Sequence, residues 1–85
     1  MRAWGKIKTQ DTIKDDFVLD ATDFASALET ICTCFNLSKP IVCSKHLKEI
    51  EAFSRTVFYE DDFVEPVDFD TLEIEIIGDK KKDEN

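Results

Sequence analysis

The chain has 85 residues, with 19 acidic and 11 basic side chains and a formal net charge of −8 at pH 7. This length fits one domain built around one hydrophobic core. The negative charge disfavours sequence-independent binding to nucleic acid and docking on an anionic membrane surface, because both are themselves negatively charged. The sequence has no apolar run near the roughly 20 residues that span a bilayer.

Two strands are expected at the N-terminus. The alternation of residues 1–7 places Trp4 and Lys6 on the more polar face of the first strand. The polar stretch 8–12 predicts a turn, although it lacks the Asn-Gly type of signal that marks a tight hairpin. Residues 13–19 supply the second strand, so a hairpin with a loop of undetermined length is expected.

A helix is expected over residues 23–35, where apolar side chains recur at helical spacing. Asp20 or Thr22 is expected to cap its first turn, since short oxygen-bearing side chains accept hydrogen bonds from free backbone N–H groups there. Asn36 suits the left-handed position that ends a helix. This segment has the clearest periodicity in the chain.

A second, shorter helix is expected after the break at Pro40, from about residue 45 to residue 53, with Ser44 as its N-cap. Leu47, Ile50 and Phe53 form its apolar stripe, which predicts that this side of the helix is buried.

The last part of the chain predicts two more strands. Residues 55–59 are β-branched and aromatic, and residues 71–77 alternate between apolar and acidic side chains. Pro66 demotes the segment 63–69 to an edge strand or an ordered loop. The order β-β-α-α-β-β predicts an α+β domain over residues 1–78, a mostly antiparallel sheet with two helices packed on one face. Residues 79–85 form a charged tail, expected to be disordered.

Three segments of the chain form a recognisable pattern: the opening Met-Arg-Ala-Trp-Gly-Lys-Ile, the end of the first helix from Ile31 to Phe35 with Lys-Pro-Ile after it, and the closing Phe-Asp-Thr-Leu-Glu-Ile of residues 69–74. With these segments the chain resembles short bacterial proteins of about 80 residues that have no assigned function. The resemblance implies an intracellular bacterial setting. It implies no activity and no cofactor.

The cysteines and the single histidine raise two hypotheses. Three cysteines are too few for a disulfide-stapled scaffold, so a reducing cytoplasm is expected. Cys32, Cys34, Cys43 and His46 could form a zinc site that stabilises a small binding module. However, side chains two positions apart on a helix point about 200° apart, so Cys32 and Cys34 are expected on opposite sides of the helix. This geometry favours the alternative that a cysteine here only fills part of the hydrophobic core.

The second hypothesis is a thiol-based enzyme. Cys43 is the most reactive candidate, because it lies just ahead of the second helix and close to His46. No acid is evident to orient His46, which is expected to be an exposed surface residue. The two glycines, Gly5 and Gly78, are too few for a phosphate-binding loop. The sequence therefore predicts no catalytic residue, no metal site and no cofactor.

The charge distribution gives the favoured hypothesis, a non-enzymatic protein-interaction or accessory protein that binds a protein partner or a second copy of itself. Residues 56–78 contain acidic but no basic side chains, whereas the preceding segment is locally basic. The acidic stretch is either a solvated surface balanced within the fold or a patch for a basic partner. Trp4 is the expected anchor of the contact. The expected polar surface is Glu60, Asp61, Asp62, Glu65, Asp68 and Asp70.

Overall fold

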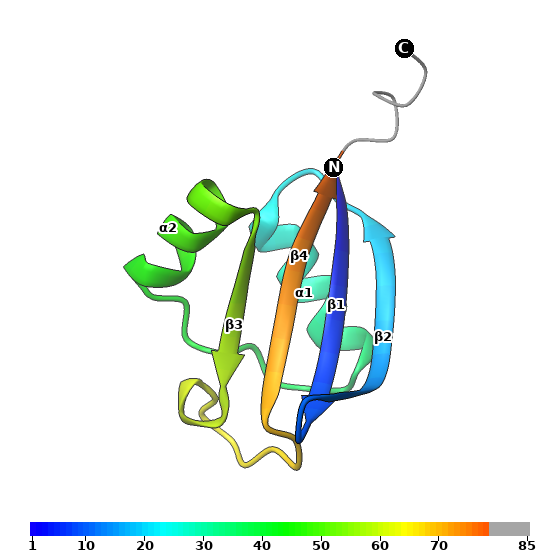
Figure 1. Cartoon of the computed structure of the whole chain (residues 1–85), viewed down its shortest axis with the longest axis vertical. Coiled ribbons are helices and arrows are strands. Elements are labelled where there is room, and N and C mark those ends of the chain that lie inside the picture. Colours follow the sequence, from blue (N-terminus) through cyan, green and yellow to red (C-terminus); the bar gives the residue numbers. More distant parts are fainter. Residues whose placement is uncertain (79–85) are drawn as a thin grey trace.

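The computed structural model describes residues 1–78, which form one four-stranded sheet and two α-helices (Figure 1). The elements follow one another as β1 (Arg2–Thr9), β2 (Thr12–Asp20), α1 (Phe24–Cys34), α2 (Ser44–Phe53), β3 (Arg55–Tyr59), a short 3₁₀ helix η1 (Glu60–Asp62) and β4 (Thr71–Gly78). The predicted order β-β-α-α-β-β and the α+β class are confirmed. The predicted tail, residues 79–85, lies outside the described residues.

The strands are antiparallel and lie in the order β2-β1-β4-β3. The first and the last strand are therefore neighbours at the centre of the sheet, with Arg2 opposite Gly78. The segment that contains Pro66 is an ordered loop and adds no strand. Phe63 and Phe69, at either end of this loop, are buried in edge-to-face contact, with ring centroids 5.6 Å apart.

The turn between β1 and β2 is tighter than the sequence indicates. Gln10 and Asp11 form a two-residue turn with φ angles of 55° and 66°, both left-handed, which matches the twist of a hairpin. Neither residue is the glycine that favours this conformation. Asp70 supports the turn from outside the hairpin, because its carboxylate accepts the Gln10 N–H at 2.7 Å and its own N–H donates to the Lys8 carbonyl at 2.9 Å.

Helix α1 packs on the sheet through the predicted apolar stripe, and Ala27, Leu28 and Ile31 are buried. Its cap is Asp23, so the prediction of Asp20 or Thr22 was wrong. The Asp23 carboxylate accepts the Ser26 N–H at 2.8 Å, three residues along the chain, and this bond holds the pKa of Asp23 below its ordinary value.

The end of α1 agrees with the sequence, since Asn36 has the left-handed φ of 60°.

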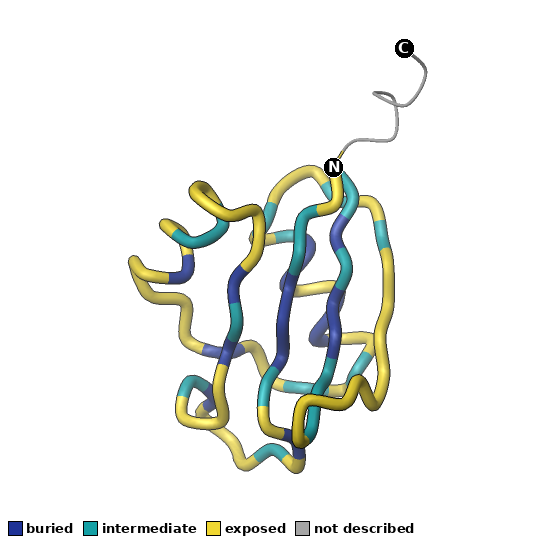
Figure 2. Tube along the Cα trace, viewed as in Figure 1, coloured by how far each residue is buried: buried dark blue, intermediate teal, exposed yellow. Residues whose placement is uncertain are grey.

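Helix α2 packs differently from the prediction. Its N-cap is Cys43, and Ser44 is the first residue of the helix. The predicted apolar stripe is not buried, because Leu47 and Phe53 are exposed. His46 faces the interior instead and stacks on Phe58 of β3, with ring centroids 4.3 Å apart. Most of α2 is accordingly exposed in Figure 2.

Both helices contact the same side of the sheet. Gly5, Ile74 and Thr56 are cross-strand neighbours on β1, β4 and β3. Gly5 lies against Ile31 of α1, and the Thr56 hydroxyl donates to Glu49 of α2. Successive residues of a strand point to opposite faces, so the other face carries the intervening side chains. Neither helix covers that second face, which is called the open face below.

Candidate interaction surface

The open face presents two rows of cross-strand neighbours. The first row runs Val18, Trp4, Glu75 and Arg55, and the second runs Asp16, Lys6, Glu73 and Val57. Charged side chains of opposite sign alternate across the central strands, an arrangement that stabilises a sheet. The face carries four basic side chains (Arg2, Lys6, Lys8 and Arg55) and four acidic ones (Asp16, Asp20, Glu73 and Glu75), so its charges balance although the chain as a whole is acidic.

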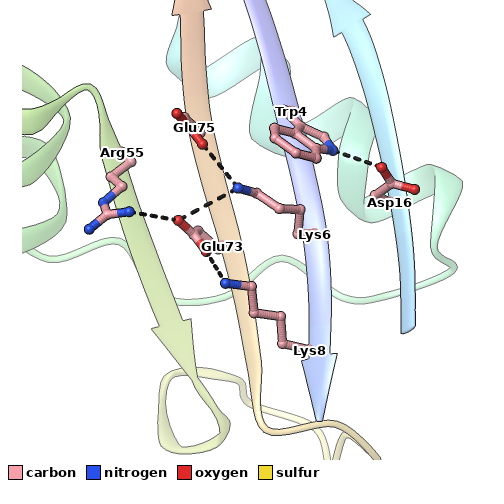
Figure 3. Close-up of polar contacts among 7 residues, drawn as sticks. All are labelled: Trp4, Lys6, Lys8, Asp16, Arg55, Glu73 and Glu75. Carbon is pink, nitrogen blue, oxygen red and sulfur yellow. Dashed lines mark hydrogen bonds and ion pairs between the residues drawn. The ribbon is translucent and has the colours of Figure 1, made fainter. Parts of the chain in front are cut away.

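Glu73 is the centre of a charge network on this face (Figure 3). Its carboxylate lies 2.7 Å from the Lys8 ammonium, 3.7 Å from that of Lys6 and 3.4 Å from the Arg55 guanidinium. Lys6 also donates to Glu75 at 2.9 Å. Lys6 and Glu73 are only 6% and 4% exposed, although no helix covers them. Their neighbours on the face shield them from water, and each charge is satisfied by a partner.

Trp4 is held in a fixed orientation on the same face. Its indole N–H donates to Asp16 of β2 at 2.8 Å, and the Lys6 ammonium lies 3.9 Å from the centroid of its ring (Figure 3). The second contact is a cation–π interaction, which adds about 0.5–1 kcal/mol at exposed sites. Trp4 is half-buried and lies on the polar side of β1, as the alternation of residues 1–7 predicts.

The network sets the protonation of Glu73. Burial pushes its pKa upward, but the hydrogen bond from Lys8 and the charges of Lys6, Lys8 and Arg55 outweigh this, so the pKa of Glu73 is below its ordinary value. A carboxyl group whose pKa is lower in the folded state stabilises the fold above its unfolded-state pKa, near 4.3. That contribution is lost as the pH falls through the folded-state pKa.

We therefore expect Glu73→Gln to lower the free energy of unfolding by about 2 kcal/mol at pH 7, because Lys6 loses one of its two carboxylate partners. Urea denaturation of both proteins between pH 7 and pH 2 checks this, and the difference between them should shrink as the wild-type carboxyl becomes protonated. Glu75→Gln is the matched control, expected to cost less because Glu75 is more exposed. An equal difference at pH 7 and pH 2 would contradict the assignment.

The structure divides the predicted acidic surface. Asp62, Glu65 and Asp70 are used inside the fold: Asp62 accepts the Tyr59 N–H at 2.9 Å, Glu65 accepts the Ser38 hydroxyl at 2.8 Å, and Asp70 supports the hairpin turn. Glu60, Asp61 and Asp70 share a shallow hollow of about 280 Å³ with Tyr59 at the end of β3. Asp68 lines a different hollow, together with Lys14 and Phe69. Three of the six acids therefore come together, beyond the last residue of β3.

The cysteines do not come together with His46 as a metal site. Cys32 is buried, whereas Cys34 and Cys43 are exposed. Within residues 1–78 there is no group of three or more cysteine, histidine or acidic side chains that could hold a metal ion. The geometry therefore offers no ligand set for the zinc hypothesis. Burial also raises the pKa of the Cys32 thiol to about 11, despite the opposing charge of Lys39, so this thiol stays protonated at neutral pH.

His46 is fully buried, so the prediction that it is an exposed surface residue was wrong. Its Nδ1 accepts the backbone N–H of Cys43 at 2.8 Å, which assigns the proton of the neutral ring to Nε2. Nε2 lies 3.6 Å from the Asp62 carboxylate and has no hydrogen-bond partner among the described residues. Because backbone N–H occupies Nδ1, that nitrogen is not free to take a proton from the Cys43 thiol. His46 Nδ1 is therefore committed to the backbone of the helix N-terminus and not to the Cys43 thiol.

No protein-family model, curated protein or solved structure matches the chain. Neither helix in the described part of the chain is both long enough and apolar enough to cross a membrane.

The charge network of the open face was not predicted from the sequence. Its signal is the matching alternation of Lys6 and Lys8 on one strand with Glu73 and Glu75 on another. That signal becomes informative once the two strands are known to be neighbours.

Proposed function

We propose that the chain is a non-enzymatic protein-interaction or accessory domain of the bacterial cytoplasm, and that its contact surface is the open face around Trp4. The observation that carries the proposal is a fixed tryptophan beside a nearly buried charge network, on a sheet face that neither helix covers. Ordered side chains lose little freedom on binding, and tryptophan and arginine are the side chains that most often anchor protein interfaces. The free thiols of Cys32, Cys34 and Cys43 support the proposed location in a reducing compartment.

The charge of the surface indicates the kind of partner. The open face is balanced, so a partner that docks there needs alternating charges and an apolar spot for Trp4, rather than the strongly basic surface that the net charge suggests. Val18 and Tyr59, which border the face on β2 and β3, are exposed and add apolar area. This composition, with aromatic and apolar groups between satisfied charges, is typical of interfaces that form and dissociate.

Site-specific photo-crosslinking in native cells tests the proposal. A photoreactive amino acid at Val18, next to Trp4, is expected to give one discrete adduct, which mass spectrometry identifies. The same group at Thr30, an exposed position on α1, is the matched control and should give none. Trp4→Ala should abolish the Val18 adduct. An adduct of twice the chain mass would identify a second copy as the partner, and equal labelling from Val18 and Thr30 would refute the open face as the contact surface.

A further inference from the structure

The charges on the open face are arranged in columns, with one sign on each strand. Along the sheet from β2 to β3 the signs alternate as negative, positive, negative and positive (Figure 3). Because the number of columns is even, the reversed order has the opposite sign at every position. The charged side chains of the face, within residues 1–78, are Asp16 and Asp20 on β2, Arg2, Lys6 and Lys8 on β1, Glu73 and Glu75 on β4, and Arg55 on β3.

A second copy of the chain can match this face. Stacked sheets keep their strand directions within about 30° of each other, so a two-fold axis between two such faces runs either along the strands or across them. An axis along the strands, between β1 and β4, places β3 of the second copy over β2 and its β4 over β1, so every column faces the opposite charge. An axis across the strands places each column over itself and opposes like charges. The charge pattern therefore selects the first arrangement.

The outer strands supply the charged contacts between the two copies. In this arrangement Arg55 of β3 lies opposite Val18 of the second copy, between its Asp16 and Asp20. The side chain of Arg55 is 61% exposed, and both aspartates are exposed as well. The two-fold axis repeats this contact, so the interface has two such corners. Each corner joins accessible charges of opposite sign.

The same arrangement pairs apolar side chains. Ile13, Lys8, Thr71 and Tyr59 form a third row of cross-strand neighbours, so Ile13 of one copy lies opposite Tyr59 of the other. In the single chain, Ile13 is 46% exposed and Tyr59 is 55% exposed. Trp4 lies on a central strand next to the axis, so the two copies of Trp4 meet near the centre of the interface, where anchoring aromatic residues cluster.

The area of the open face indicates a dimer that forms and dissociates. Its four strands are five to nine residues long. With strands about 4.8 Å apart and a rise of about 3.3 Å per residue, they cover roughly 500 Å². Two such faces bury roughly 1,000 Å², which is below the range of about 1,200–2,000 Å² for stable interfaces and within that of transient ones. The net charge of −8 on each chain weakens association further.

We propose that the open face binds a second copy of the chain, stacked face to face about a two-fold axis that runs along the strands between β1 and β4. This inference rests on the proposed role in protein interaction and names the partner of that same surface. Two features carry it, because one axis accounts for both: the complementary charge columns and the match of Ile13 with Tyr59.

Charge reversal on the outer strands tests the arrangement by sedimentation equilibrium of the full chain. Arg55→Glu places acidic groups together at both corners and should raise the dissociation constant of the dimer at least about tenfold. Asp20→Lys should raise it about threefold in the wild-type chain but lower it about threefold or more in the Arg55→Glu chain, since the new pair then has opposite charges. The two residues lie on opposite edge strands, roughly 14 Å apart, so this change of sign cannot arise within one chain.

Two variants on the helices are the matched controls. Lys48→Glu and Glu29→Lys make the same changes of net charge at exposed positions away from the open face. Lys48→Glu should weaken the dimer far less than Arg55→Glu, and Glu29→Lys should have the same small effect in the wild-type and Arg55→Glu chains. An effect of Asp20→Lys with the same sign in both chains, or equal losses in Lys48→Glu and Arg55→Glu, would overturn the proposal.

The outcomes also separate this inference from the proposed function. A chain that stays monomeric at every concentration, while Val18 still crosslinks to a different protein, would overturn the second copy as the partner and leave the open face as the contact surface. A monomeric chain that gives no Val18 adduct would overturn both.

Discussion

Replacing His46 with alanine is expected to lower the free energy of unfolding by about 3 kcal/mol, since it empties a fully buried site and leaves a backbone donor unpaired. The imidazole fills the space between α2 and Phe58 and accepts the Cys43 N–H at 2.8 Å, so one side chain both packs the helix on the sheet and fixes its first turn. Urea denaturation followed by circular dichroism measures the loss.

Two further substitutions separate these roles. His46→Asn keeps an acceptor near the position of Nδ1 while removing the ring that stacks on Phe58, so it should recover only part of the lost stability. Lys48→Ala, at an exposed position of the same helix, should change the free energy of unfolding by less than about 0.5 kcal/mol. If His46→Ala were as mild as Lys48→Ala, the packing of α2 through the histidine would be disproved.

Gly5→Ala is expected to destabilise the protein by about 1–3 kcal/mol, because a methyl group there overpacks the contact between β1 and α1. A Cβ atom at this position would lie 2.8 Å from Cγ2 and 2.9 Å from Cδ1 of Ile31, closer than such atoms approach one another. The backbone of Gly5 is not in the left-handed region, so the cost comes from the side chain of Ile31 and not from strain in φ.

A double-mutant cycle with Ile31→Ala isolates this contact. Ile31→Ala alone should cost about 3 kcal/mol, since it leaves a cavity in the core. In that background the clash is gone and the new methyl group fills part of the cavity, so Gly5→Ala should become neutral or stabilising. A coupling free energy of at least about 1 kcal/mol is therefore expected from thermal or urea unfolding. Additive effects would show that α1 does not rest on Gly5.

Local periodicity accounts for the part of the fold that could be predicted. The apolar stripe of α1 and the alternation in β1 and β4 each depend on residues close in sequence, and they place Ile31 inward and Trp4 outward as observed. A turn was predicted within residues 8–12, but its tight two-residue form at Gln10 and Asp11 was not, because Asp70, from a distant loop, supports it. Patterns among residues that are close in sequence do not show which distant residue will support a turn.

The candidate site could be predicted only in part, for the same reason. The position of Trp4 on the polar face of β1 follows from alternation, but the network around Glu73 depends on which strands are neighbours and in which register. His46 was misplaced because the apolar stripe of α2 indicated another buried side. Phe53, which belongs to that stripe, instead borders a hollow between α2 and β3 and is 70% exposed.

The position of β4 between β1 and β3 has a consequence for how the protein is made. Ribosomes deliver the chain from its N-terminus, so β1 and β3 emerge before the strand that joins them. Until residues 71–78 leave the exit tunnel, the hairpin of β1 and β2 and the unit of α2 and β3 have no shared sheet, and Lys6 has neither of its carboxylate partners. Contacts between residues this far apart in sequence form slowly. Assembly of the sheet is therefore a late event that waits for the final strand, β4, to join β1 and β3.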